Sequence, residues 1–116
     1  MSLTEFQKQV VTRVQAIPYG KVVSYGQIAQ SIYRPHSARQ VGWVMRSLEL
    51  KVDMPWWRVL NAKGVITIKG NILNDAPTQK SLLESEGVVV RSDYTIDMDK
   101  YRYMFNSEEF PDTESA

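Results

Sequence analysis

Apolar residues recur at helical spacing in three stretches of the first half of the chain, and this spacing predicts three helices. The first stretch follows residue 4 and stops at the Pro-Tyr-Gly sequence of residues 18–20. The second is short and ends before Arg34-Pro35, because a residue that precedes proline is pushed away from helical geometry. The third follows residue 37. In chain order, the apolar positions are Phe6, Val10, Val14 and Ile17, then Ile28, Ala29 and Ile32, then Val41, Val44, Met45 and Leu48.

Each of these helices is predicted to begin with a capping box, in which a hydroxyl side chain caps the helix and a glutamine three residues later reaches back. The boxes occupy residues 4–7, 24–27 and 37–40. Only residues 33–36 separate the second helix from the third, so the pair is predicted to form a helix-turn-helix.

The third helix is predicted to have a basic and aromatic outer side. At roughly 100° per residue, Arg39, Trp43 and Arg46 lie opposite its apolar stripe. A tryptophan between two arginines can stack on bases and neutralise phosphates, which favours a DNA-binding face. A helix that forms dimer contacts can present the same residues, and this alternative stays open.

Two hairpins and a fourth helix are predicted in the second half of the chain. Residues 56–60 and 65–68 are β-prone and flank Asn61-Ala-Lys-Gly64, so they predict a hairpin where a wing follows a helix-turn-helix. Leu82-Leu83 and the stop at Gly87 predict a helix over residues 75–86. Residues 88–91 and 94–96 predict a second hairpin, and a short segment near residues 100–105 follows.

These elements define the expected fold class as α+β and mainly helical: a winged-helix-like helix-turn-helix DNA-binding domain with short β-hairpins. Residues 1–105 are expected to form this one domain. Residues 106–116 hold four acidic residues and no basic one, and they are expected to form a disordered acidic tail.

The composition narrows the possible chemistry. The chain of 116 residues has no cysteine and one histidine, His36. Disulfides, thiolate metal sites and thiol nucleophiles are therefore excluded, and a zinc site or a histidine-dependent triad has little to build on. We expect no cofactor and no metal.

Charge is distributed unevenly along the chain. Residues 1–69 hold 10 Lys and Arg against 3 Asp and Glu, a net charge of +7, whereas the remainder holds 4 against 10, a net charge of −6. This asymmetry favours a polyanionic partner for the first part, with ordinary solvated surface charge as the alternative. The sequence shows neither a run of about 18 apolar residues nor a signal-peptide pattern, so we expect a soluble intracellular protein with no membrane partner. It would be cytoplasmic and nucleoid-associated in a bacterium and nuclear in a eukaryote.

Four motifs then occur in order: Ile-Pro-Tyr-Gly-Lys-Val at residues 17–22, Ser-Tyr-Gly-Gln-Ile-Ala at 24–29, Ala-Arg-Gln-Val-Gly at 38–42 with Met45-Arg46, and Pro-Trp-Trp-Arg-Val at 55–59. The series resembles the DNA-binding domain of the alkylguanine-DNA alkyltransferases, and most of all their non-enzymatic relatives, the alkyltransferase-like proteins. The resemblance extends from about residue 4 to residue 105. It implies a protein that binds O6-alkylguanine in double-stranded DNA, rotates the nucleotide out of the duplex, transfers no alkyl group and marks the site for nucleotide excision repair proteins.

The resemblance also gives the last motif a meaning. In the enzymes it reads Pro-Cys-His-Arg-Val, and the cysteine accepts the alkyl group; Trp56 stands at that position here. Trp57 stands where the enzymes keep a histidine that relays a proton to a glutamate, and Glu86 matches that glutamate. We expect Glu86 to accept hydrogen bonds in a structural role. For Trp57, core packing is favoured over contact with the lesion.

By resemblance, Arg39 is a finger that enters the base stack, with an ordinary phosphate contact or no contact as the alternative. Tyr25 presses on the phosphate beside the flipped nucleotide, with packing on the core as the alternative, and Trp56 forms a wall of the base pocket. Val59 and Leu60 are expected to offer backbone groups to the base edge, and Lys69 is either a cation over the purine or a solvated loop charge. The complete set of predicted DNA- and lesion-binding residues is Tyr25, Ser37, Ala38, Arg39, Gln40, Pro55, Trp56, Arg58, Val59 and Lys69, with Trp43 and Arg46 added on helix geometry alone.

A different binding function competes with this one: a winged-helix regulator that reads a DNA sequence. Enzymatic functions fit less well, because alkyl transfer and base excision both need a nucleophile that the sequence does not place. We expect the protein to act as a monomer.

Overall fold

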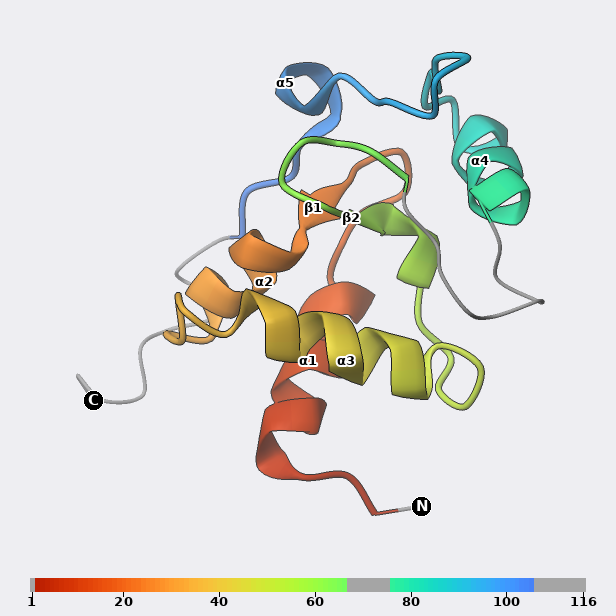
Figure 1. Ribbon diagram of the computed structural model, residues 1–116. Coiled ribbons are helices and arrows are strands. Elements are labelled where there is room, and N and C mark those ends of the chain that lie inside the picture. Colours follow the sequence, from red (N-terminus) through yellow and green to blue (C-terminus); the bar gives the residue numbers. More distant parts are fainter. Residues whose placement is uncertain (1, 67–75, 106–116) are drawn as a thin grey trace.

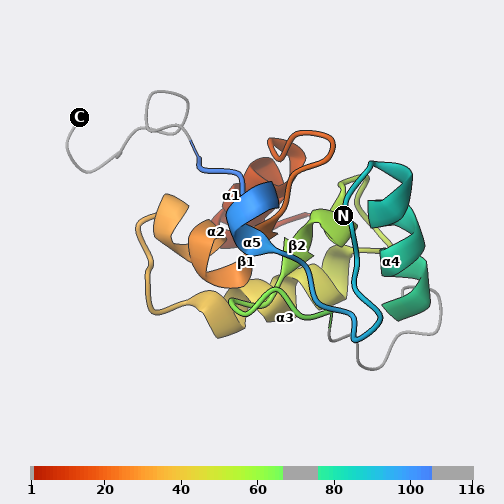
Figure 2. The ribbon, with the colours of Figure 1, turned by 90° about the horizontal axis from the view of Figure 1, so that it is seen from above.

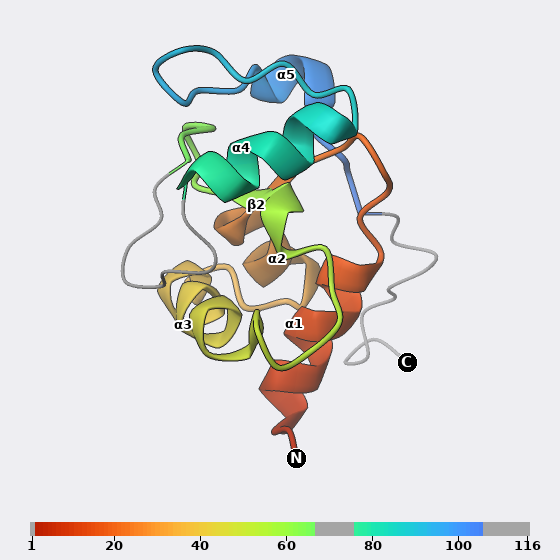
Figure 3. The same cartoon turned by 90° about the vertical axis from the view of Figure 1, so that its right-hand side faces the viewer.

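The computed structural model describes residues 2–66 and 76–105. The predicted contact of Lys69 and the predicted tail at residues 106–116 lie outside this range. The elements are α1 (Glu5–Gln15), β1 (Val23–Ser24), α2 (Tyr25–Ser31), α3 (Ala38–Leu48), the 3-10 turn η1 (Trp56–Arg58), β2 (Val59–Leu60), α4 (Ala76–Ser85) and α5 (Met98–Tyr101). In Figures 1 and 3, α1 and α3 lie at one end of the molecule and α4 and α5 at the other, with the β1–β2 pair between them. Seen from above in Figure 2, α2 and α4 lie on opposite sides of this pair.

Two of the three predicted capping boxes are present. Thr4 Oγ1 accepts the N–H of Gln7 at 3.1 Å, and Gln7 Oε1 accepts the N–H of Thr4 at 2.8 Å. Ser24 and Gln27 form the same pair of bonds, at 3.1 and 3.0 Å. The third prediction is wrong: the Ser37 side chain makes no capping bond, because its backbone (φ −104°, ψ 21°) lacks the extended geometry that aims a cap at the helix.

The turn between α2 and α3 confirms the predicted helix-turn-helix. The N–H of Arg34 donates to the carbonyl of Ala29 at 2.9 Å, and the N–H of Tyr33 donates to the carbonyl of Gln30 at 3.0 Å. These two bonds form a Schellman motif, and Tyr33 takes the left-handed conformation (φ 61°) that glycine usually adopts there. The turn reverses the chain, so that the apolar stripes of α2 and α3 face one core.

The buried apolar residues form two clusters. The helix-turn-helix cluster is built mainly by α1, α2 and α3, with further residues from the loop after α1, from β1 and from either side of η1; its members are Val10, Val11, Val14, Ile17, Val23, Ile28, Ala29, Ile32, Val41, Val44, Met45, Leu48, Met54 and Val59. The α4 cluster lies under α4 and α5; its members are Val22, Leu60, Ile66, Leu83, Val88, Val90, Ile96, Met98 and Tyr101. The predicted apolar stripes of the second and third helices are buried as expected, and in the first helix Val10, Val14 and Ile17 are buried while Phe6 is half-buried.

Within the described residues, the strand pairing differs from the two predicted hairpins; residues 67 and 68 of the first hairpin lie outside them. Residues 56–58 form the 3-10 turn instead of a strand, and β2 pairs in parallel with β1, Val23 opposite Val59 and Ser24 opposite Leu60. Val65 forms an antiparallel bridge with Thr95, so the chain after the turn pairs with the C-terminal part of the domain. Within the described residues, 88–91 belong to no strand, although the N–H of Arg91 donates to the carbonyl of Thr95 across the predicted turn.

Gly64 explains why the predicted wing hairpin does not close on residues 56–60. Its N–H donates to the carbonyl of Asn61 at 3.0 Å, so a turn forms where predicted. However, Gly64 has φ 72° and packs so tightly that a Cβ would lie 2.6 Å from the Ile96 carbonyl oxygen. The glycine therefore directs the chain toward residues 94–96, where the N–H of Ile96 donates to the carbonyl of Gly64 at 2.9 Å.

The segment after α5 ties the C-terminal part of the domain to the start of α2. The N–H of Val22 donates to the carbonyl of Tyr101 at 2.9 Å, and the N–H of Tyr103 donates back to the carbonyl of Val22 at 2.8 Å. Gln27, whose Oε1 completes the capping box, also donates from Nε2 to the Tyr103 carbonyl at 2.7 Å. The N-terminus of α2 is therefore held by both halves of the chain.

Candidate nucleic-acid interface

The outer side of α3 carries the predicted basic and aromatic residues. Arg39, Trp43 and Arg46 are all exposed, and 58% of Trp43 is accessible. The opposite side of the helix is buried in the helix-turn-helix cluster. At the start of α3, Gln40 is exposed and Ser37 and Ala38 are half-buried. The structure thus places six of the candidate residues on the outer face of α3 or at the start of this helix.

Tyr25 is the first residue of α2 and is half-buried against the helix-turn-helix cluster. Burial raises the pKa of its phenol, the negative charge of Glu49 raises it further, and the positive charge of Arg46 opposes them. The phenol therefore stays protonated near neutral pH and can donate a hydrogen bond to a phosphate oxygen.

The η1 turn positions two neighbouring tryptophans differently. The N–H of Trp56 donates to the carbonyl of Met54 at 2.8 Å, and the N–H of Arg58 donates to the carbonyl of Pro55 at 3.1 Å, which closes the turn. The half-buried Trp56 packs against the helix-turn-helix cluster, whereas Trp57 packs against the α4 cluster. Their ring centroids are 5.9 Å apart and their planes make an angle of 89°.

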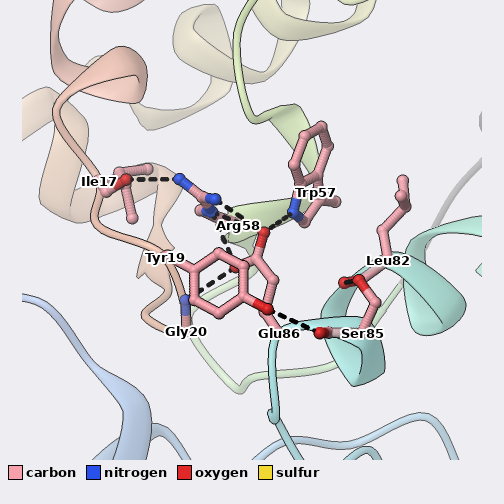
Figure 4. Close-up of polar contacts among 8 residues, drawn as sticks. All are labelled: Ile17, Tyr19, Gly20, Trp57, Arg58, Leu82, Ser85 and Glu86. Atoms are coloured by element: carbon pink, nitrogen blue, oxygen red, sulfur yellow. Dashed lines mark hydrogen bonds and ion pairs between the residues drawn. The ribbon is translucent and has the colours of Figure 1, made fainter.

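Glu86, one residue past α4, accepts hydrogen bonds from three directions (Figure 4). Trp57 Nε1 donates to Oε2 at 2.7 Å, the N–H of Gly20 donates to Oε1 at 2.8 Å, and Arg58 donates from Nε and from its NH2 group, the latter at 2.7 Å. Only 4% of the Glu86 side chain and 13% of the Arg58 side chain are exposed. The expectation that Glu86 serves as a structural acceptor agrees with this geometry.

These contacts determine the charge state of Glu86. Burial raises the pKa of its carboxyl group, but the hydrogen bonds from Arg58, Gly20 and Trp57 and the charge of Arg58 outweigh burial, so the pKa lies below its ordinary value. The carboxylate is thus ionised at neutral pH and holds its donors in fixed positions.

Arg58 and Val59 were predicted to contact DNA. In the structure, the guanidinium of Arg58 and the backbone of Val59 form hydrogen bonds within the protein. Besides its bonds to Glu86, Arg58 donates to the carbonyl of Ile17 at 2.7 Å. Val59 is buried, its N–H donates to the carbonyl of Trp56, and its own carbonyl accepts Gln79 Nε2 at 3.1 Å. Contact of either residue with DNA stays a prediction.

Two residues of this region were not predicted from the sequence. Gln79 is buried in α4 and donates from Nε2 to the carbonyls of both Trp57 and Val59, so it fixes the backbone on each side of Arg58. Gly20 supplies a backbone donor to Glu86. A polar residue one turn before the apolar pair of α4 is a weak signal for Gln79, and no sequence signal identifies the Gly20 contact.

Within residues 2–66 and 76–105, no group of three or more His, Cys, Asp or Glu side chains is arranged to hold a metal ion. None of the helices in the same part of the chain is long and apolar enough to cross a membrane.

The fold and this face together define a DNA-binding domain of the helix-turn-helix class. The model of the 6-O-methylguanine DNA methyltransferase DNA-binding domain matches residues 5–88, and the chain belongs to this family. The fold class predicted from the sequence, mainly helical with a helix-turn-helix, is confirmed by this match.

The chain is also similar to individual members of the family. It is 38% identical over 107 residues to alkyltransferase-like protein 1 of Schizosaccharomyces pombe, which covers 89% of this chain and 98% of that protein. It is 38% identical over 100 residues to the DNA base-flipping protein of Escherichia coli, over 86% of this chain and 75% of the relative. Among solved structures, S. pombe Atl1 in complex with damaged DNA containing O6-carboxymethylguanine aligns with a TM-score of 0.79 at 38% identity, over 90% of this chain and 100% of the other.

A methyltransferase of the family is similar over a smaller share of its length. The methylated-DNA–protein-cysteine methyltransferase of Mycobacterium tuberculosis is 36% identical over 93 residues, which are 80% of this chain and 54% of that protein. Its name specifies a cysteine, whereas the present chain has none.

Proposed function

We propose that this protein binds O6-alkylguanine lesions in duplex DNA and flips the damaged nucleotide without accepting its alkyl group. The proposal is carried by the absence of cysteine from the chain, and it is supported by the Pro-Trp-Trp-Arg-Val motif of the η1 turn, in which the family resemblance assigns Trp56 the place of the acceptor cysteine. An indole ring has no nucleophilic thiolate to take the alkyl group, but it offers a flat apolar surface against which an alkylated base can pack.

In this proposal α3 enters the minor groove. Arg39 fills the gap left by the flipped nucleotide, because a planar guanidinium can stack on bases and donate hydrogen bonds to the orphaned base. Trp43 and Arg46 extend the contact along the groove, and Tyr25 donates to a phosphate beside the lesion. The residues at the start of α3 (Ser37, Ala38 and Gln40) and those around η1 (Pro55, Arg58 and Val59) complete the proposed contact set, with Lys69 beyond the described residues.

The energetics favour damaged bases. Rotating a nucleotide out of the stack costs a few kcal/mol, and the cost is lowest where pairing is already weakened, as it is at O6-alkylguanine. A sequence-independent minor-groove contact supplies affinity for any duplex, and the weaker pairing then provides the selectivity. In this proposal, the protein binds undamaged duplex DNA weakly and alkylated duplex DNA more tightly.

The test is a gel-shift titration that compares an O6-methylguanine duplex with the same duplex containing guanine, at several salt concentrations. We expect tighter binding to the alkylated duplex at every salt concentration. Equal affinity for the two duplexes, together with preference for one undamaged sequence, would instead identify a sequence-specific winged-helix regulator.

Absence of alkyl transfer is tested separately. After incubation with DNA labelled on the O6-alkyl group, the protein should carry no label, and Trp56→Cys should carry none either, because Trp57 cannot accept the proton of the new thiol. Label on the variant would show that the remaining site activates a thiol, which contradicts this account of Trp57.

We further propose that the monomeric protein, bound to its lesion, recruits nucleotide excision repair proteins, in the cytoplasm of a bacterium or the nucleus of a eukaryote. The support is the missing acceptor: a protein that recognises a lesion without removing it leaves repair to others. Crosslinking of the lesion complex in a cell extract, followed by identification of repair proteins that are absent with undamaged DNA, tests this step.

A further inference from the structure

Trp57 lies at the junction between the two apolar clusters. The η1 turn directs Trp56 to the helix-turn-helix cluster and Trp57 to the α4 cluster, and the two rings meet edge to face at 5.9 Å. Any movement of the Trp57 ring therefore changes the surface against which the Trp56 ring rests.

The Trp57 ring is held in place by polar contacts as well as by packing. Its Nε1 donates to Glu86 Oε2 at 2.7 Å, and the guanidinium carbon of Arg58 lies 5.5 Å from its ring centroid (Figure 4). Glu86 is itself held by the N–H of Gly20, and the carbonyl of Trp57 accepts Gln79 Nε2 at 2.9 Å. The indole ring has a single N–H, which can only donate a hydrogen bond. Trp57 can therefore bond to Glu86 only when this N–H points at the carboxylate, and the bond fixes the orientation of the ring.

We propose that Trp57 is a positioning residue: its hydrogen bond to Glu86 holds the Trp56 ring in the orientation that receives the flipped base. The inference rests on the proposed function and explains how a pocket wall made of a large aromatic residue keeps one shape. A wall that is already ordered loses little conformational entropy when the base arrives, so the bond strengthens binding of the flipped base and leaves the contact of α3 with undamaged DNA unchanged.

Two substitutions separate the hydrogen bond from the bulk of the ring. Trp57→Phe keeps an aromatic ring and removes the donor, whereas Trp57→His keeps an N–H donor on a smaller ring. We expect Trp57→Phe to reduce the preference for the O6-methylguanine duplex over the guanine duplex by about tenfold, the loss that corresponds to about 1.4 kcal/mol. Trp57→His should retain most of the preference. Should Trp57→Phe not fold, Trp57→His still tests the proposal. Loss of the preference in Trp57→His would show that an N–H donor at this position is not sufficient and that the bulk of the ring matters, which contradicts the proposal.

Tyr19→Phe is the matched control. The Tyr19 hydroxyl donates to the carbonyl of Ser85 at 2.8 Å, next to Glu86, and its removal deletes a hydrogen bond of the same region without touching the carboxylate. This control should keep the full preference. A preference that is unchanged in Trp57→Phe, or an equal loss of affinity for both duplexes, would overturn the proposed positioning role.

A measurement on the free protein keeps this inference distinct from the proposed function. The chain has three tryptophans, so NMR of the indole N–H groups gives three separable signals. In the unsubstituted protein the Trp57 N–H should exchange slowly with solvent and the Trp56 indole should be rigid; in Trp57→Phe the Trp56 indole should become mobile. Failure to discriminate alkylated DNA with a rigid Trp56 would refute the proposed function alone, whereas a Trp56 signal unaffected by Trp57→Phe would refute the positioning role alone.

Discussion

Replacement of Glu86 by glutamine is predicted to destabilise the protein by about 3 kcal/mol at neutral pH. Glutamine has nearly the same shape as glutamate, so the α4 cluster is not disturbed. The substitution removes the negative charge opposite Arg58 and turns one of the two acceptor oxygens into a donor. Any loss of stability then measures the hydrogen-bond network rather than packing.

The magnitude follows from the contacts. Oε1 of Glu86 accepts the N–H of Gly20, and Oε2 accepts Trp57 and Arg58, so either orientation of an amide places a donor against a donor. Breaking a buried ion pair by removal of one partner costs about 3–5 kcal/mol. The lower end applies, because the carbonyl of Ile17 still accepts one bond from Arg58.

The assay is urea unfolding followed by circular dichroism, with Glu84→Gln as the matched control. Glu84 lies in the last turn of α4, two residues before Glu86, and pairs with Lys80 at 3.1 Å, but 45% of its side chain is exposed. Such an exposed pair is worth about 0.5 kcal/mol or less. In thermal melts, about 3 kcal/mol corresponds to a fall of roughly 12 °C in Tm for a domain of this size, whereas the control should move by a degree or two.

Acid titration tests whether the ionised form of Glu86 is the stabilising one. The pKa of Glu86 is lower in the folded protein than its ordinary value of 4.5, so its contribution to stability is complete above about pH 4.5 and is lost as the pH falls through the folded-state pKa. The stability gap between the unsubstituted protein and Glu86→Gln should therefore be constant near neutral pH and should narrow below pH 4.5. A gap that stays constant into strong acid, or a loss no larger than that of Glu84→Gln, would refute the reasoning.

Three further predictions concern the interface and the backbone. Arg39→Ala should nearly abolish the fluorescence increase of a reporter base at the lesion, because nothing fills the vacated stack; an unchanged increase would rule out the finger. Arg46→Ala should reduce the slope of log affinity against log salt by about one, whereas Trp43→Ala should lower affinity about tenfold with the slope unchanged, since a neutral ring releases no counterion; equal slopes would place Arg46 away from phosphate. Gly64→Ala should cost about 3 kcal/mol in urea unfolding and Gly87→Ala about 1 kcal/mol, because both positions have positive φ but only the first lacks room for a Cβ; similar losses would show that backbone strain, not packing, dominates at residue 64.

The parts of the fold that the sequence predicted correctly depend on neighbours in the chain. The capping boxes at Thr4 and Ser24 use partners three residues away, and the buried stripe of α3 follows from the helical repeat alone. The outer face of α3 was predicted for the same reason: once one side of a helix is apolar, Arg39 and Trp43 have to be on the other.

The errors concern contacts between distant segments. Residues 56–60 have high β propensity, but propensity does not specify the partner, and Val59 pairs with Val23 instead of residues after the turn. At Ser37 the residue type suits a cap, yet the tight turn after α2 sets a backbone conformation that prevents it. Propensity for a strand or a cap is local information, whereas register and backbone angles in a short turn depend on what packs around it.

In the candidate site, too, local features could be predicted from the sequence and contacts between distant segments could not. The role of Glu86 as an acceptor could be predicted from the family resemblance, which implies that this glutamate has lost both partners of a proton relay because tryptophans stand at the positions of the cysteine and the histidine. The donors to Glu86 could not be predicted, because Gly20 comes from a different segment from Arg58 and Trp57. In addition, the 2.7 Å contact with Trp57 depends on the η1 turn, where the sequence predicts a strand.

These donors explain why a carboxylate suits position 86 without proton transfer. A backbone N–H, an indole N–H and a guanidinium keep their protons near neutral pH, so the group between them has to accept from all three at once. Glutamine has one acceptor oxygen, an apolar residue has none, and the side chain of aspartate is one methylene shorter. The hydrogen bonds from η1 and Gly20 therefore account for a glutamate at this position without any proton transfer. A glutamate at this position is consequently not evidence of alkyl transfer, and in the proposed function the residue that separates a binder from an enzyme is the one at position 56.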